Sequence, residues 1–190
     1  MDARRYSEKI VLPHGKAAVV RAIRPDDRDR LAAAFLALEP ESVYLRYFTY
    51  KKELTEADLD RLCNPDFRER VVLVVTVGDG AKEVMIGAGG YVARDAPDAT
   101  PDAKRVAEVA FVVGEAFRGQ GIAGKLLAVL VPIARNDGIV QFEAEVLTRN
   151  APMLEVFARS GLPMEQKHED DSVVRLTLSL LAANPAGVSR

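Results

Sequence analysis

The chain has 190 residues, of which 48% are hydrophobic and 28% are charged, the composition of an ordinary globular domain that buries about 70% of the surface of its unfolded chain. Its net charge of −2 provides no positive field for nucleic acid. Because no apolar run is long enough to cross a membrane and the first residues lack the apolar segment of a signal peptide, we expect a cytoplasmic protein with neither nucleic acid nor a membrane as partner.

The first elements follow a charged N-terminal segment. Residues 1–15 are charged and irregular, and we expect them to form a flexible lead-in to a single domain over residues 16–183. Ala17–Arg24 is predicted to be the first strand. Pro25 and the two aspartates after it open a helix that ends near Pro40, because proline and acidic residues are favoured in a first helical turn.

An aromatic segment and a capped helix come next. Ser42–Tyr50 contains three tyrosines and a phenylalanine, and two interpretations stay open: a helix that packs its rings into the core, or rings that contact a substrate. Thr55–Cys63 is predicted to be a helix, because Thr55 and Asp58 form a capping pair at its start.

Two strands and a loop complete the first half. Val71–Val77 is almost entirely apolar, which predicts a strand covered on both faces. Val84–Arg94 is the next predicted strand, and its three glycines indicate a bulge or the close approach of another backbone. The polar, proline-containing segment Asp95–Asp102 is predicted to be a loop. The three glycines of the predicted strand Val84–Arg94 are Gly87, Gly89 and Gly90.

The centre of the chain combines a strand, a glycine-rich turn and a helix. Val106–Val113 is rich in β-branched residues, which favours a strand, and Glu108 is the only charged residue inside it. A helix is predicted to start near Gln120 and to end at Gly138. Between them, the glycines of Arg118–Lys125 let the backbone approach a ligand, and the free amides of the helix start favour an anion.

The last part of the chain is predicted to add three strands and one helix. Ile139–Leu147 alternates between apolar and polar residues, as a half-exposed strand does. Asn150 caps the following helix. Strands are predicted over Pro163–His168 and Val173–Leu180, and the tail over residues 184–190 is expected to be frayed. This order describes one mixed α/β domain.

Three phosphate-binding interpretations compete for the glycine-rich turn. Its glycine spacing matches a dinucleotide-binding turn, but only about 65 residues follow, too few for the usual doubly wound half. Gly119, Gly124 and Lys125 also match a nucleoside-triphosphate loop. In that loop, however, Leu126 stands where a serine or threonine must ligate magnesium.

The third interpretation rests on a resemblance. The pattern R-x-x-G-x-A over Arg118–Ala123 follows a strand that ends in Val113, and in this the chain resembles the GNAT superfamily of acyl-CoA-dependent N-acyltransferases. The run AEVAFVV before it and the segment Ala144–Met153 resemble the Pat-type protein lysine acetyltransferases. The resemblance extends from about Val19 to Gly161.

The resemblance implies a fold and a ligand. The implied fold is α/β (α+β), with a central mixed, mostly antiparallel sheet of six to seven strands, a splayed central strand pair and about four flanking helices. It also implies that the loop amides bind the diphosphate of acetyl-CoA, that the preceding strand binds the pantetheine arm, and that the aromatic segment lines an acceptor groove. The implied cofactor-binding residues are Phe111, Val112, Val113, Arg118, Gly119, Gln120, Gly121, Ile122, Ala123, Gly124, Lys125 and Asn150.

The implied reaction needs a base, because free lysine is only about 0.04% neutral at pH 7. Glu108 is the candidate: burial in an apolar strand is expected to raise its proton affinity, and Pat-type relatives carry a catalytic glutamate at this place. The alternative is that Glu108 lies in solvent or pairs with Arg105, and Glu145 is the second choice of base. Many GNAT enzymes have a tyrosine as general acid where this chain has Phe157, so no acid is assigned.

We therefore expect an acetyl-CoA-dependent N-acetyltransferase that acts on a primary amine, with a protein lysine, such as one in an acyl-CoA synthetase, as leading acceptor. Acetylation of a small amine or a protein N-terminus is the alternative within the enzyme class, and a non-catalytic acyl-CoA-binding regulatory module is the alternative outside it. No metal site is expected, because Cys63, His14 and His168 are far apart in the sequence. The oligomeric state stays open.

Overall fold

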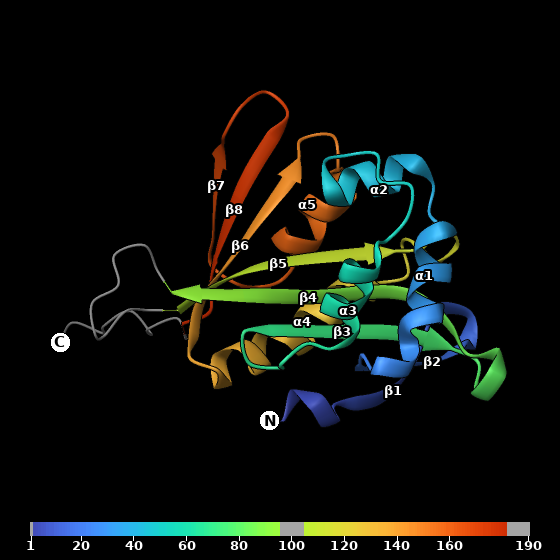
Figure 1. Ribbon diagram of the computed structural model, residues 1–190. Helices are drawn as coiled ribbons and strands as arrows, with labels where there is room; N and C mark the ends of the chain where they lie inside the picture. The colour runs from blue at the N-terminus through green and yellow to red at the C-terminus, as the bar shows by residue number, and fades with distance from the viewer. Residues whose placement is uncertain (1, 96–104, 182–190) are drawn as a thin grey trace.

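The computed structural model describes residues 2–95 and 105–181. Within them, one sheet runs through the molecule and helices lie on both of its faces (Figure 1). The tail expected over residues 184–190 lies outside the described residues, as does the loop expected over Asp95–Asp102 beyond its first residue.

The sheet has eight strands: β1 (Ser7–Val11), β2 (Ala17–Ala22), β3 (Arg70–Val77), β4 (Val84–Asp95), β5 (Arg105–Val113), β6 (Ile139–Leu147), β7 (Met164–His168) and β8 (Val173–Ser179). Their order is β1-β2-β3-β4-β5-β6-β8-β7. Neighbouring strands run antiparallel except β5 and β6, which run parallel. The mixed, mostly antiparallel sheet is thus confirmed, with one strand more than the six to seven expected.

The described residues form five α-helices: α1 (Arg28–Leu36), α2 (Pro40–Tyr47), α3 (Glu56–Cys63), α4 (Ile122–Asn136) and α5 (Ala151–Ala158). In Figure 1, α1 and α3 lie in front of the sheet and α4 lies behind it. Within the described part of the chain, no helix has both the length and the apolar character needed to span a bilayer.

The N-terminal segment is part of the sheet, which corrects the loose lead-in expected over residues 1–15. Ser7–Val11 pairs with β2 in antiparallel register, and Tyr6 packs against the main core. The sequence concealed this strand because every second residue of an edge strand lies in water here. Its few apolar residues therefore did not stand out among the charges.

Strand β3 separates two apolar clusters. Val71, Leu73 and Val75 belong to the main core beneath α4, whereas Val72 and Val74 pack with residues of α1 and α3. Successive residues of a strand point to opposite faces, so an uninterrupted apolar run serves both clusters. The prediction that this strand is covered on both faces is confirmed.

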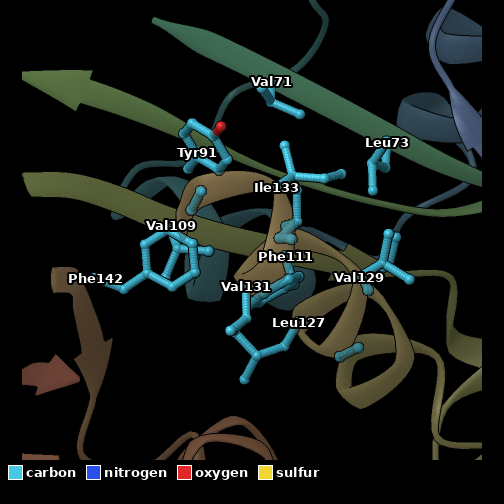
Figure 2. Packing of buried hydrophobic residues seen from close by; sticks show 14 of the residues in the cluster. Val71, Leu73, Tyr91, Val109, Phe111, Leu127, Val129, Val131, Ile133 and Phe142 are labelled. Atoms are coloured by element: carbon cyan, nitrogen blue, oxygen red, sulfur yellow. The ribbon is translucent and has the colours of Figure 1, made fainter. Parts of the chain in front are cut away.

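The main core lies between α4 and the back of the sheet (Figure 2). Ile133 of α4 is 1% exposed, and it lies between Val71 of β3 and Phe111 of β5 in this view. Leu126 and Leu130 precede Ile133 by seven and three residues, the spacing of one helix face, and belong to the same core. The helix ends before Gly138, whose φ of 75° closes it as predicted.

Strands β5 and β6 pair only where they start. The parallel ladder joins Arg105–Glu108 to Ile139–Glu143. From Val109 onward, β4 is the only strand among those described that pairs with β5. The two strands then diverge (Figure 1), which confirms the splayed central pair. The edge of β5 that faces β6 is thus left without a strand partner over residues 109–113.

Replacing Gly90 with alanine is expected to destabilise the fold by about 3 kcal/mol, because overpacking a rigid site forces the backbone apart. A Cβ at Gly90 would lie 2.2 Å from the carbonyl oxygen of Val71 on β3. Urea unfolding of the variant checks this. Gly114→Ala is the matched control, since its Cβ would meet its nearest atom at 3.5 Å. Equal stabilities of the two variants would contradict the close approach of β3 and β4.

Candidate functional site

The divergence of β5 and β6 opens a cavity of about 1150 Å³. Its walls come from α2, the end of β5, the glycine-rich turn, α4, β6 and α5. Five arginines and three glutamates line it, so the lining carries an excess of positive charge that suits an anionic ligand. They are Arg46, Arg118, Arg135, Arg149, Arg159, Glu108, Glu145 and Glu155.

The glycine-rich turn presents backbone amides at one end of this cavity. Gly119 and Gly121 have left-handed φ values of 70° and 78°, which glycine adopts without strain. The first amides of a helix have no acceptor within the helix. Gly121, the N-cap of α4, has no side chain that could accept from them. Helix starts of this kind bind anions.

Most of the residues expected to bind the cofactor line the cavity, but Gln120 and Lys125 do not. The side-chain Nε2 of Gln120 donates to the backbone carbonyl of Ala116 at 3.2 Å. Lys125 Nζ lies 2.6 Å from a carboxylate oxygen of Glu8 on β1 and, as its hydrogen-bond partner, holds the pKa of Glu8 below its ordinary value. The residues that line the cavity are Phe111, Val112, Val113, Arg118, Gly119, Gly121, Ile122, Ala123, Gly124 and Asn150.

Glu108 stands where the two strands begin to diverge. It is the last residue of β5 in register with β6, opposite Glu143, and it lines the cavity. Its side chain is exposed, which corrects the expectation of a buried carboxylate: its neighbour on β4, Val92, is itself 39% exposed, so this face of the sheet is open here. Among the described residues Glu108 forms no ion pair, and Arg105 donates instead to the carbonyl of Asp137.

The other candidate residues of the cavity already have partners. Glu145 accepts a hydrogen bond from an arginine of β8 at 2.8 Å, which makes it the weaker candidate for a base. The side chain of Asn150 accepts from the backbone N–H of Met153 at 3.3 Å, confirming the predicted cap of α5. Phe157 is 1% exposed, and its ring centroid lies 5.9 Å from that of Phe111. Phe157 thus serves as a core residue.

The aromatic segment lies in α2 only as far as Tyr47, because Phe48 caps the helix and Tyr50 follows it; its rings divide between two environments. Tyr47 and Phe48 line the cavity, and Tyr47 also packs edge-on against Phe35 of α1 at 5.7 Å between centroids. Tyr44 packs against Tyr50 instead, at 4.8 Å. None of the four rings is among the buried residues of the described chain or in either apolar cluster, which corrects the interpretation that they pack into the core.

Ser42 and Glu115 were not predicted to belong to the site. Ser42 lines the cavity and is 4% exposed. Its hydroxyl donates to Glu115, which is 73 residues away in the chain, and accepts from Arg118. A single serine and a glutamate in a turn form no sequence pattern, so only the folded chain brings them together.

The two competing interpretations of the glycine-rich turn do not fit the structure. Leu126, at the position of a magnesium-ligating hydroxyl, is 0% exposed and belongs to the main core. The sheet has one parallel strand pair, whereas a dinucleotide-binding fold is built from a series of parallel βαβ units. The acyl-CoA interpretation therefore remains.

Comparisons with known proteins point to the same family. A family model described as the acetyltransferase (GNAT) domain matches residues 18–163. The protein named acetyltransferase Pat from Mycolicibacterium smegmatis is 32% identical over 147 residues, which are 77% of this chain and 41% of that relative. The chain thus spans less than half the length of this relative.

Solved structures extend the comparison. The GNAT domain of S. lividans PAT is 37% identical, with a TM-score of 0.79 over 91% of this chain and 96% of that one. The yncA protein of Salmonella typhimurium, solved with its cofactor acetyl-CoA, is 19% identical, with a TM-score of 0.63 over 88% of this chain and 97% of that one. At this identity the second comparison concerns the fold alone.

Proposed function

Because the chain belongs to the GNAT acetyltransferase family, we propose that it transfers the acetyl group of acetyl-CoA to a primary amine, the side chain of a protein lysine. One observation carries this proposal. Glu108, the free edge of β5 and the open amides of the glycine-rich turn face one cavity of about 1150 Å³. A base, a strand edge and an anion site in one cavity match the parts that the reaction needs.

The cavity fits the shape and charge of acetyl-CoA. The diphosphate would lie against the amides at the start of α4, where the helix dipole favours negative charge. The pantetheine arm would extend along the free edge of β5 over residues 109–113, because its amides can pair with an unpaired strand edge. The glycines of the turn leave the space that this requires: a Cβ at Gly119, Gly121 or Gly124 would meet nothing within 4 Å.

In this proposal Glu108 removes a proton from the amine. A protonated lysine has no lone pair with which to attack a thioester carbonyl, so a carboxylate at the fork of the two strands is in place to accept that proton. The neutral nitrogen then bonds to the carbonyl carbon, the carbon–sulfur bond breaks, and CoA leaves as a thiolate. The nitrogen loses its second proton to solvent or to that thiolate, which leaves a neutral amide. A thiol of ordinary pKa near 8.5 departs without a general acid, which agrees with the buried, hydroxyl-free Phe157.

The proposal also specifies the acceptor, a protein lysine, and the cellular compartment. The resemblance to Pat proteins supports a lysine of a protein such as an acyl-CoA synthetase, with the cytoplasm as the place of reaction. A small amine and a protein N-terminus are the competing acceptors.

Calorimetric titration with acetyl-CoA tests the ligand. We expect micromolar binding of acetyl-CoA and no heat with NAD or with ATP and magnesium, because Leu126 fills the metal-ligating position of a nucleotide loop. Binding of NAD or ATP in place of acetyl-CoA would overturn the proposal.

Replacing Gly124 with alanine is expected to stabilise the free protein and to weaken its binding of CoA. Alanine in a helical turn is favoured over glycine by roughly 1 kcal/mol, and the added Cβ would meet no protein atom within 4 Å. The methyl group would, however, stand where the diphosphate approaches the amides, and losing one charged hydrogen bond lowers affinity about tenfold. Thermal unfolding and calorimetry measure the two effects. Unchanged CoA affinity would show that the diphosphate binds elsewhere.

A further inference from the structure

Two segments of the chain, residues 39–42 and residues 115–118, meet at one carboxylate beside the glycine-rich turn. Oε1 of Glu115 accepts from the backbone N–H of Glu39 at 3.0 Å and from the hydroxyl of Ser42. The same oxygen lies 3.4 Å from Nη2 of Arg118. Glu39 and Ser42 stand at the start of α2, whereas Arg118 opens the turn. Glu115 therefore connects α2 to the turn.

The hydroxyl of Ser42 completes this connection. It accepts from Nη2 of Arg118 at 2.5 Å while it donates to Glu115, which one hydroxyl does with its single hydrogen and its lone pairs. Ser42 is 4% exposed, so bulk water does not compete for it. We name the contacts of Ser42, Glu115 and Arg118 the Ser42 bridge.

The carboxylate of the bridge is held in its charged form. Burial alone would raise the pKa of Glu115, but hydrogen bonds from Ser42 and from backbone amides, together with the nearby Arg118 guanidinium, hold it below the ordinary value. A negative charge is also favourable at the N-terminus of a helix, here α2. The bridge is thus stable at neutral pH.

The bridge leaves part of the arginine for a ligand. Only Nη2 of Arg118 has a partner among the described residues, and the guanidinium carries five N–H donors in a planar fork. The side chain is 46% exposed at the cavity. Beyond Ser42, α2 continues along the cavity wall with Tyr47.

We propose that Ser42 and Glu115 are positioning residues that fix one edge of the Arg118 guanidinium and tie the glycine-rich turn to α2, so that CoA binding is transmitted to α2. The inference rests on the proposed function, since it takes the turn as the site of the CoA diphosphate. Ordering a long arginine side chain before the ligand arrives lowers the entropy lost on binding. Contacts that the diphosphate adds at the free edge of the guanidinium then restrain the bridge and, through it, the first turn of α2.

Hydrogen exchange with and without CoA tests the inference in the wild type, Ser42→Ala and Glu115→Gln. In the wild type, CoA should slow amide exchange over residues 40–48 and over residues 119–126. In both variants CoA should bind about three- to tenfold more weakly, because binding then has to order the Arg118 side chain. At saturating CoA they should keep the protection of the turn and lose that of α2. A general loss of structure would not produce this split.

Glu41→Gln is the matched control, because Glu41 is an exposed acid in the same turn of α2 that pairs with Arg149 rather than with Arg118; it should keep both protected segments. Protection of α2 that persists in the variants, or that is missing in the wild type, overturns the inference. If Ser42→Ala does not fold, Glu115→Gln decides. A wild-type protein that does not bind CoA overturns the proposed function itself.

Discussion

Replacing Glu108 with glutamine is expected to lower kcat for acetyl transfer at least about 100-fold, the usual contribution of a general base. The affinity for acetyl-CoA should change less than about twofold, because the amide keeps the size of the side chain while losing its ability to accept the proton of the amine. Thiol release from acetyl-CoA with a lysine peptide measures kcat, and calorimetry measures the affinity.

Glu145→Gln is the matched control for this variant. Glu145 lines the same cavity from β6, but it pairs with an arginine of β8, so we expect a change in kcat of less than about threefold, within the range of an exposed ion pair. If the Glu145 variant were inactive and the Glu108 variant active, the base would be Glu145. If both variants kept full activity, the neutral amine would have to arise without either carboxylate.

Replacing Arg21 with methionine is expected to destabilise the protein by about 3–5 kcal/mol, because it leaves the buried carboxylate of Asp27 with the longer, 3.4 Å contact to Arg30 as its one ion pair among the described residues. Arg21 is 3% exposed and Asp27 is 0% exposed. Two guanidinium nitrogens of Arg21 donate to the two carboxylate oxygens of Asp27 at 2.6 and 2.7 Å, and one of them also reaches Glu83 at 2.9 Å. Urea unfolding of the variant at pH 7 measures the cost.

The pH dependence of this loss follows from Asp27. Burial alone would raise the pKa of Asp27, but hydrogen bonds from Arg21 and the amide of Arg24 hold it below its ordinary value of 3.8 in the folded protein. A lowered folded-state pKa adds stability above pH 3.8 that is lost as the pH falls through the folded pKa. The difference in the free energy of unfolding between the wild type and Arg21→Met should therefore become smaller below about pH 4.

Arg28→Met is the control for Arg21→Met. Arg28 pairs with Glu56 and Asp60, but the arginine is 30% exposed and both acids are more exposed. We therefore expect Arg28→Met to lower the free energy of unfolding by no more than about 1 kcal/mol. The buried ion pair would be contradicted if Arg21→Met lost no more unfolding free energy than Arg28→Met. It would also be contradicted if the loss for Arg21→Met stayed constant down to pH 3.

Local patterns predicted most of the fold. The apolar run of β3 has to be covered on both faces, and the periodic residues of α4 together with Gly138 define a helix and its end. Strand β1 was missed, because an edge strand needs few apolar residues and its pairing with β2 is a tertiary contact. The helix caps at Thr55 and Asn150 were predictable, since a cap is a contact within one turn.

The candidate site was predictable only where it is local. The glycines of the turn and the strand before it are contiguous in sequence, and they line one cavity. The partner of Lys125 lies 117 residues away on the strand that was missed, and Ser42 meets its partners across more than 70 residues. The exposure of Glu108 depends on which part of the sheet the helices leave open, and strand alternation does not contain that information.

In the proposed function, the cavity at the fork of β5 and β6 transfers acetyl from acetyl-CoA to an amine. The most direct test incubates the wild-type protein with acetyl-CoA and a lysine-containing protein or peptide, and follows released CoA thiol together with the mass of the acceptor. We expect CoA thiol to be released only when the acceptor is present, in an amount equal to the number of acetyl groups that lysine gains. Acetyl-CoA binding without release of thiol to lysine peptides, small amines or protein N-termini would contradict it and would favour a non-catalytic acyl-CoA-binding module.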